Sequence, residues 1–123
     1  AIKNTVSSLL NAEEIIHFQQ LIRRIPVADN VIEYAVSLVS KTRPNSSRAS
    51  EIVNQYIEWG AGPRASQNLI LAAKKHAAFN GKYSPDIEDV QAVALGILRH
   101  RIVKNYKAEA EGITEEMIIA KLV

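Results

Sequence analysis

Cysteine is absent from this sequence, aromatic residues are few, and no apolar run is long. Without cysteine, disulfide bonds and thiolate metal ligands are excluded. Aromatic residues make up 6% of the 123 residues and hydrophobic residues 47%, so we expect an aliphatic core. No apolar stretch approaches the roughly 20 residues that a membrane-spanning helix needs, which argues against a membrane partner. The first residues lack the pattern of a signal peptide, and we expect a cytoplasmic protein.

Neither sign of charge dominates, since 15 lysine and arginine residues stand against 13 acidic ones for a net charge of +2. A surface of mixed charge gives little support to nucleic-acid binding. The length suits one domain, and we predict a single domain over 1–123. Because the first residue is Ala1 rather than Met, we expect the chain to be a fragment of a longer protein.

Apolar residues recur at the spacing of α-helices through most of the chain. No segment alternates polar and apolar residues for long, so we predict an all-α fold, a small bundle of four to five helices with no sheet. The main helices are expected over 12–25, 29–43, 63–80 and 87–101, and shorter ones over 51–59 and 115–122. We interpret residues 1–10 as a lead-in and the charged residues 104–112 as a connector before the last helix.

Residues with known preferences for helix ends support these boundaries. Asn11 with Glu14 fits a capping box at the first helix, and Asp86 with Asp89 has the same spacing at the fourth main helix. Thr114 is expected to cap the last helix. In the first helix, apolar residues recur at helical spacing at Ile15, Phe18, Ile22 and Ile25, with Leu21 beside them.

The chain is organised around the stretch Trp59-Gly60-Ala61-Gly62-Pro63-Arg64-Ala65-Ser66. Its glycines break the chain, and Pro63 suits the first position of the long helix that follows. Arg64 then falls in the first turn, where the free N–H groups and the helix dipole are already positive. A helix N-terminus with an arginine is a good phosphate-binding arrangement. The alternative is an Arg64 side chain that extends into water without a ligand, and the local sequence alone favours this alternative.

The chain has no motif for catalysis of its own. It contains no G-x-x-x-x-G-K-[ST] loop to hold phosphates, and no dinucleotide-binding pattern around Gly60. His17, His76 and His100 lie far apart in the sequence, so no metal site is expected, and His76 is interpreted as a packing residue. The acidic pairs stand at helix starts, where they complement the dipole. Ser66 has no visible base partner, and we predict no catalytic residue in this chain.

Two basic clusters, Arg23-Arg24 and Arg99-His100-Arg101, close two of the predicted helices. Cations at helix C-termini are favourable in themselves. If both clusters faced one way with Lys74 and Lys75, they would form a nucleic-acid-binding patch, although no aromatic residues interleave with them. A further alternative is a protein-interaction bundle, with an exposed docking patch formed by Tyr56, Ile57 and Trp59.

Several segments together match one known family. The most specific pair is Gly60-Ala61-Gly62-Pro63-Arg64-Ala65-Ser66 and the downstream Leu98-Arg99-His100-Arg101-Ile102. The other matching segments are Ala12-Glu13-Glu14-Ile15, Arg24-Ile25-Pro26-Val27, Thr42-Arg43-Pro44, Leu71-Ala72-Ala73-Lys74, Gly81-Lys82-Tyr83, Ile87-Glu88-Asp89-Val90, Val93-Ala94-Leu95 and 105–114. With these motifs, nearly the whole chain resembles the C-terminal lid of the MoxR family of AAA+ ATPases. Two positions depart from the family pattern: Gly62 stands where Ser is frequent, and Ile87 where many members have Pro.

The resemblance implies a lid that folds over ATP and Mg²⁺ held by an AAA+ core, which would precede this chain in the parent protein. Arg64 would be the sensor 2 residue that reaches the γ-phosphate, with Gly62, Pro63 and Ala65 at the helix N-terminus near the nucleotide. It also implies a homo-oligomeric ring, often a hexamer, chaperone-like remodelling and a von Willebrand factor A-domain partner. The nucleotide-binding core itself is not in this sequence, so we expect no tight ATP binding by this chain alone.

Overall fold

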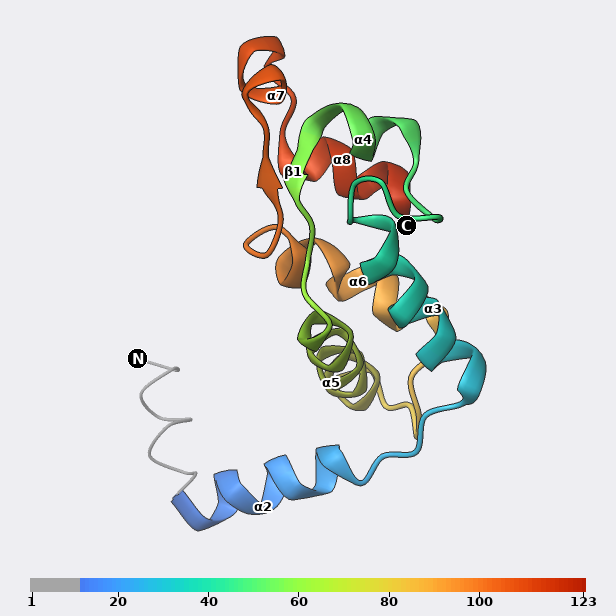
Figure 1. Cartoon of the computed structure of the whole chain (residues 1–123). Helices are drawn as coiled ribbons and strands as arrows, with labels where there is room; N and C mark the ends of the chain where they lie inside the picture. The colour runs from blue at the N-terminus through green and yellow to red at the C-terminus, as the bar shows by residue number, and fades with distance from the viewer. Residues whose placement is uncertain (1–11) are drawn as a thin grey trace.

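Helices make up most of residues 12–123, the part of the chain that this computed structural model describes (Figure 1). They are α2 (Ala12–Arg23), α3 (Asp29–Lys41), α4 (Glu51–Tyr56), α5 (Arg64–Phe79), α6 (Ile87–Leu98), α7 (Tyr106–Glu111) and α8 (Glu115–Leu122). The all-α prediction is confirmed. Within the described residues, no helix is both long and apolar enough to cross a membrane.

A short antiparallel pair of strands corrects the prediction that the chain has no sheet. Strand β1 (Ile57–Trp59) pairs with β2 (Val103–Lys104), with Ile57 opposite Lys104 and Trp59 opposite Val103. The helix predicted over 51–59 ends at Tyr56 because Ile57 is extended, with φ −105° and ψ 126°. Strands of three and two residues are too short for alternation to reveal them in the sequence.

The segment predicted as a connector, 104–112, in fact contains the end of β2 and all of α7. The Asn105 side chain accepts a hydrogen bond from the N–H of Ala108 at 2.9 Å and caps the start of α7. Gly112 ends the helix in the left-handed conformation, with φ 71°. Ala108 is the only buried residue of α7, so this helix has no apolar period that the sequence could show. With α7, the described chain has more than the four to five helices predicted.

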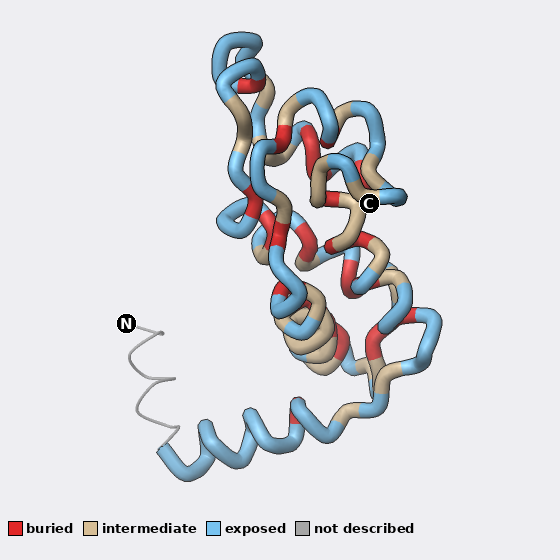
Figure 2. The backbone as a smooth tube through the Cα atoms, viewed as in Figure 1, coloured by how far each residue is buried: buried red, intermediate tan, exposed pale blue. Residues whose placement is uncertain are grey.

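The core lies between α3, α5 and α6, and α8 closes it at one end (Figures 1 and 2). It is aliphatic, as the composition predicts, and its small residues allow α5 and α6 to pack closely. The buried faces predicted for these two helices are confirmed at Leu69, Ala73, Ala77, Val90, Ala94 and Leu98. Each large aliphatic side chain buried in this way contributes about 1.5–3 kcal/mol.

Helix α2 is set apart from this core, across the far end of α5 (Figures 1 and 2). The predicted helix is present, but its apolar residues are mostly uncovered: Ile22 is its only buried residue, and Ile15 and Phe18 are exposed. A helical period reports an apolar face without saying which surface covers it. The predicted Asn11 cap lies outside the described residues.

The loop from β1 to α5 is held against the C-terminal end of α3. A Cβ atom on Gly60 would lie 2.5 Å from the backbone oxygen of Thr42 and 2.6 Å from the Cα of Arg43. Real side chains do not approach backbone atoms this closely, so only glycine fits without a shift of the backbone. Gly60 therefore allows the two chain segments to touch.

Hydrogen bonds from the end of α3 fix the same loop. The hydroxyl of Thr42, which is fully buried, donates to the Val39 carbonyl at 2.6 Å and accepts from the N–H of Ala61 at 2.9 Å. Nε of Arg43 donates to the Ala61 carbonyl at 2.9 Å. Both backbone groups of Ala61 are thus bonded to the two residues that directly follow α3, which sets where α5 begins.

The turn between α5 and α6 is organised around the buried carboxylate of Asp89. It accepts hydrogen bonds from Nζ of Lys82 at 2.6 Å and from the N–H of Asp86 at 2.7 Å, and His76 Nδ1 lies 2.6 Å away. The Asp86–Asp89 capping spacing predicted from the sequence is confirmed. Burial pushes the pKa of Asp89 upward, but the bonds from Lys82, Asp86 and His76 outweigh it and lower the pKa from 3.8 to about 2.

We predict that Asp89→Asn removes an acid-sensitive part of the stability. Because the pKa of Asp89 is lower in the folded chain, its stabilising contribution is present above about pH 4 and is lost as the pH falls from 3.8 towards 2. That contribution is roughly 2 kcal/mol. Urea unfolding at neutral pH and at pH 3 should show a smaller acid loss in Asp89→Asn than in the parent chain. Asp29→Asn, which changes an exposed carboxylate, is the control. An equal acid loss of stability in Asp89→Asn and in the parent chain would contradict this account.

The two glycines of the loop provide a matched pair of variants. Gly60→Ala should lower the free energy of unfolding by about 1–3 kcal/mol, because the new methyl group meets the backbone of Thr42 and Arg43. Gly62→Ala should be neutral or stabilise by up to about 1 kcal/mol, because nothing lies within 4 Å of its Cβ position. Urea titration of both variants measures the difference. Equal effects at the two positions would show that Gly60 does not touch α3 in solution.

Candidate functional site

The candidate site is the exposed first turn of α5, directly after the loop that α3 holds in place. Pro63 has helical backbone angles, φ −58° and ψ −30°, so the ring starts the helix where a missing N–H costs nothing. The N–H of Ala65 bonds to the Gly62 carbonyl at 3.0 Å, and that of Ser66 to the Pro63 carbonyl at 3.3 Å. The hydroxyl of Ser66 donates to the same Pro63 carbonyl at 2.8 Å. These three hydrogen bonds close the turn within residues 62–66.

Arg64 is the one cation in this turn, and its side chain is exposed. Among residues 12–123 no acidic group or carbonyl accepts a hydrogen bond or ion pair from its guanidinium, and its backbone N–H also lacks an acceptor. No acidic side chain stands in the first turn of α5 to offset the positive helix end. A cation at this end costs up to about 1 kcal/mol unless an anion compensates it.

The other three predicted site residues differ in what they present. Gly62 and Pro63 are exposed beside Arg64 and put no long side chain in front of it. The Ala65 side chain points into the core and is buried, and its N–H is already bonded. Gly62 and Pro63 therefore border the open surface, whereas Ala65 anchors the turn from beneath.

A shallow cavity of about 520 Å³ lies next to this turn, lined by residues 43–45 and 58–63. Trp59 lines it and is 68% exposed, while Arg43 lines it and is fixed to the Ala61 carbonyl. Sequence reasoning missed Thr42 and Arg43 as parts of the site. Thr42 and Arg43 lie almost twenty residues before Gly60, so no local sequence pattern links them to it. The glycine at position 60 was the one available signal, because a glycine allows another backbone to approach closely.

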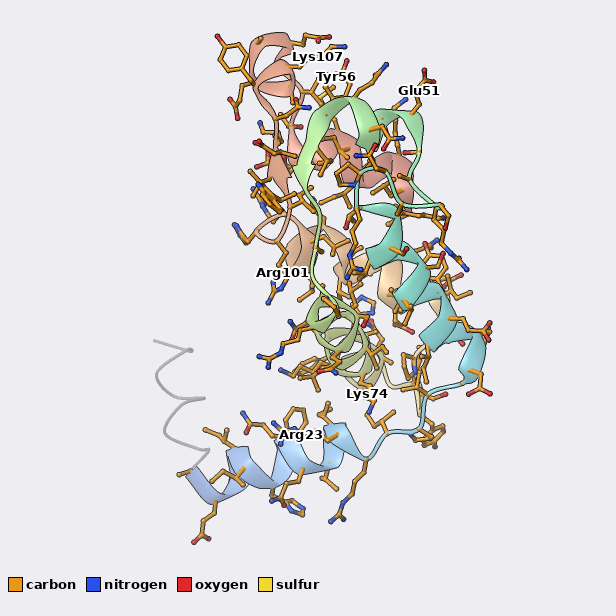
Figure 3. The ribbon with its side chains drawn as sticks, viewed as in Figure 1. Arg23, Glu51, Tyr56, Lys74, Arg101 and Lys107 are labelled. Carbon is orange, nitrogen blue, oxygen red and sulfur yellow. The ribbon has the colours of Figure 1, made fainter. Side chains whose placement is uncertain are left out.

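The basic clusters that would support nucleic-acid binding do not form one patch. Arg99 pairs with Glu116 at 2.8 Å, and Arg101 donates to the Ile97 carbonyl at 2.9 Å. Nζ of Lys74 is bonded to the Arg23 carbonyl at 2.9 Å, at the junction of α2 and α5 (Figure 3). Figure 3 shows Arg23 and Arg101 on different parts of the molecule.

The protein-interaction patch predicted from Tyr56, Ile57 and Trp59 is not continuous either. Ile57 is buried in the core, and the hydroxyl of Tyr56 donates to Glu111 at 3.0 Å. Of the three side chains, Trp59 alone is well exposed. His76 is half-buried, and its Nδ1 lies 2.6 Å from the carboxylate of Asp89. With Lys82 and Asp86 it forms what we call the Asp89 cluster.

Comparisons with known proteins agree with this geometry. The family model described as AAA lid domain matches residues 49–122. Chaperone MoxR1 of Mycobacterium tuberculosis is 30% identical over 115 residues, which cover 94% of this chain and 30% of MoxR1. The Bacillus subtilis protein YeaC is 28% identical over 119 residues, which cover 97% of this chain and 34% of YeaC.

A solved structure has the same fold. It is the crystal structure of a Cytophaga hutchinsonii protein described as an ATPase, with a TM-score of 0.83 and 35% identity over 89% of this chain and 33% of that one. The chain spans about a third of the length of each of these proteins. The chain belongs to the AAA lid domain family, and its resemblance to the lids of MoxR-type AAA+ ATPases is confirmed.

Proposed function

We propose that Arg64 is the sensor 2 residue of this lid and contacts the γ-phosphate of ATP held by an AAA+ core of the same protein. The observation that supports this most is its unpartnered guanidinium, exposed in the first turn of α5. That turn carries the motif in which the MoxR family has its sensor 2 arginine. A single lid domain over 1–123, preceded by the core, is part of the same proposal.

Physical chemistry supplies the reason for an arginine at this place. The N-terminus of a helix attracts anions through its free N–H groups and its dipole. An arginine adds a full positive charge and a planar set of donors that suits phosphate oxygens. In the lid alone the two positive features repel each other, so a phosphate between them removes an unfavourable contact as well as forming a favourable one.

The residues of this chain fit one side of a nucleotide site. Arg64 would bind the terminal phosphate, and Gly62 and Pro63 leave room for it because neither has a long side chain. The sequence has no phosphate-binding loop, so the core would provide that loop and the Mg²⁺ ligands. ATP, when bound, supplies a hydrolysable phosphoanhydride, and Arg64 would orient and neutralise its terminal phosphate.

A rigid connection from Arg64 to the rest of the lid would transmit the state of the nucleotide. Arg64 begins α5, whose buried face packs against α3 and α6 through the core. A pull on Arg64 would therefore move the bundle as a body rather than bend one loop. We extend the proposal to lid movement in a homo-oligomeric, often hexameric, ring. This ring would act in the cytoplasm in chaperone-like remodelling, with a von Willebrand factor A-domain protein as a partner.

In the longer protein that contains this chain, Arg64→Ala should lower ATP turnover by about 10- to 100-fold, the value of one charged hydrogen-bonding contact. The folded lid should keep its stability or gain up to about 1 kcal/mol, because Arg64 has no partner in it and its charge opposes the positive helix end. Steady-state hydrolysis and urea unfolding measure the two effects. Arg24→Ala is the control, since Arg24 is also exposed but lies at the end of α2. Unchanged turnover in Arg64→Ala, or an equal loss in Arg24→Ala, would refute the assignment.

The 123-residue chain by itself should bind ATP with a Kd weaker than about 1 mM. One arginine and one helix end provide only part of the contacts of a nucleotide site. Isothermal titration with ATP and Mg²⁺ tests this directly. Micromolar binding by the isolated chain would show that it contains a complete site that this account has missed.

A further inference from the structure

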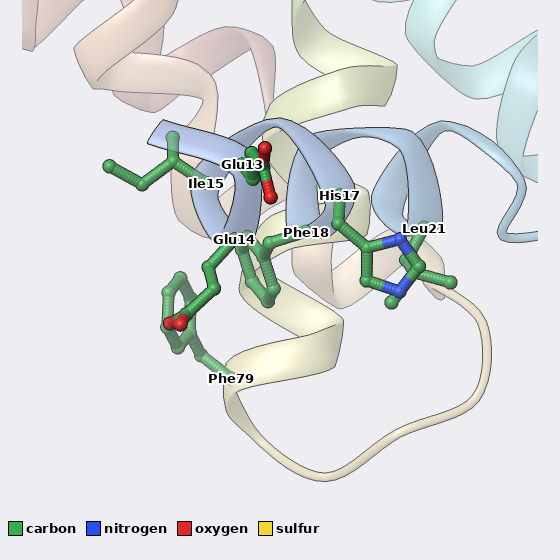
Figure 4. A pocket seen from close by; sticks show the side chains of 7 residues that line it. All are labelled: Glu13, Glu14, Ile15, His17, Phe18, Leu21 and Phe79. Carbon is green, nitrogen blue, oxygen red and sulfur yellow. The ribbon is translucent and has the colours of Figure 1, made fainter. Parts of the chain in front are cut away.

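A second surface, remote from Arg64, lies where α2 faces the end of α5. Ile15, Phe18 and Leu21 of α2, with Phe79 of α5, form what we call the α2 face (Figure 4). They line an open cavity of about 730 Å³. The rings of Phe18 and Phe79 contact each other with their centroids 6.1 Å apart.

The α2 face is apolar but uncovered by the described chain. Phe18 is 44% exposed, Leu21 47% and Phe79 78%. Large contiguous apolar patches of this kind mark interaction surfaces in soluble proteins. Three contacts attach α2 to the bundle. They are the Phe18–Phe79 ring contact, the hydrogen bond from Lys74 to the Arg23 carbonyl, and the burial of Ile22. The helix thus presents its apolar side with little support from the lid.

The comparisons show which part of the relatives includes this helix. The AAA lid domain match begins at residue 49, so α2 lies outside it. The alignments with MoxR1 and YeaC cover 94% and 97% of the chain, and the few residues left out cannot contain a helix of twelve residues. Helix α2 therefore has a counterpart in MoxR1 and YeaC, and this counterpart lies outside the part that the AAA lid domain model matches.

We propose that the α2 face is a docking surface for the AAA+ core of the same polypeptide. This rests on the proposed function, in which the core precedes the lid. In that case α2 is the described element nearest to the core along the chain. Because the core is tethered to the lid, it is present at a high effective concentration near α2. About two thirds of each relative lies outside the matched part and could provide the cover. The core surface that fits is apolar, with a basic rim opposite Glu13, which lines the cavity.

The absence of cysteine from the chain allows a direct test. Phe18→Cys places a thiol within the α2 face, and Ile16→Cys places one on the same helix outside the cavity lining. Both sites are exposed in the lid, so neither variant should unfold it. Thiol labelling, read by the mass of the labelled peptide, is compared between the 123-residue chain and the longer protein.

We expect Phe18→Cys to react at least about tenfold more slowly in the longer protein, and Ile16→Cys to change by less than about twofold. Equal labelling of Phe18→Cys in both proteins would overturn the proposal. So would protection of Phe18→Cys already in the 123-residue chain, because residues 1–11 or a second copy would then be the occupant. Loss of turnover in Arg64→Ala with unchanged Phe18→Cys labelling would reject the docking surface while leaving the proposed function intact.

Discussion

The contact between Gly60 and the end of α3 is the constraint on which the rest of this structure depends. It brings the backbone after β1 against Thr42 and Arg43, and Ala61 is then bonded through both its N–H and its carbonyl. Since Pro63 and Arg64 follow within three residues, the position and direction of α5 are determined there. A candidate phosphate-binding arginine is thus placed by a close approach of two backbones, not by contacts of its own side chain.

The lid combines a rigid part with a loosely attached one. Helices α3, α5 and α6 share one aliphatic core, and the Asp89 cluster ties the turn between α5 and α6. Helix α2 contributes only Ile22 to buried structure. Under the proposed function, the rigid part would carry a small displacement away from the nucleotide, and the α2 face would be the surface where it meets the rest of the protein. The two surfaces lie on different ends of α5, near Arg64 and near Phe79.

The sequence was informative wherever a local rule decides the structure. Helix periods identified the main helices, and the Asp86–Asp89 spacing and Thr114 identified caps that the structure contains. It failed where the deciding contact is distant. Nothing near Gly60 points to Thr42, and nothing in the period of α2 tells whether Phe18 is covered. The strands and α7 were missed because they are too short to show any period, although Asn105 and Gly112 at the ends of α7 were readable signals.

The central claim concerns where the Arg64 side chain lies when nucleotide is present. The most direct measurement is an experimental structure of the longer protein with Mg²⁺ and a non-hydrolysable ATP analogue. The account predicts the Arg64 guanidinium within about 3 Å of an oxygen of the terminal phosphate, with the Gly60–Thr42 contact unchanged. An Arg64 side chain that points into solvent while the nucleotide site is filled and closed would contradict it.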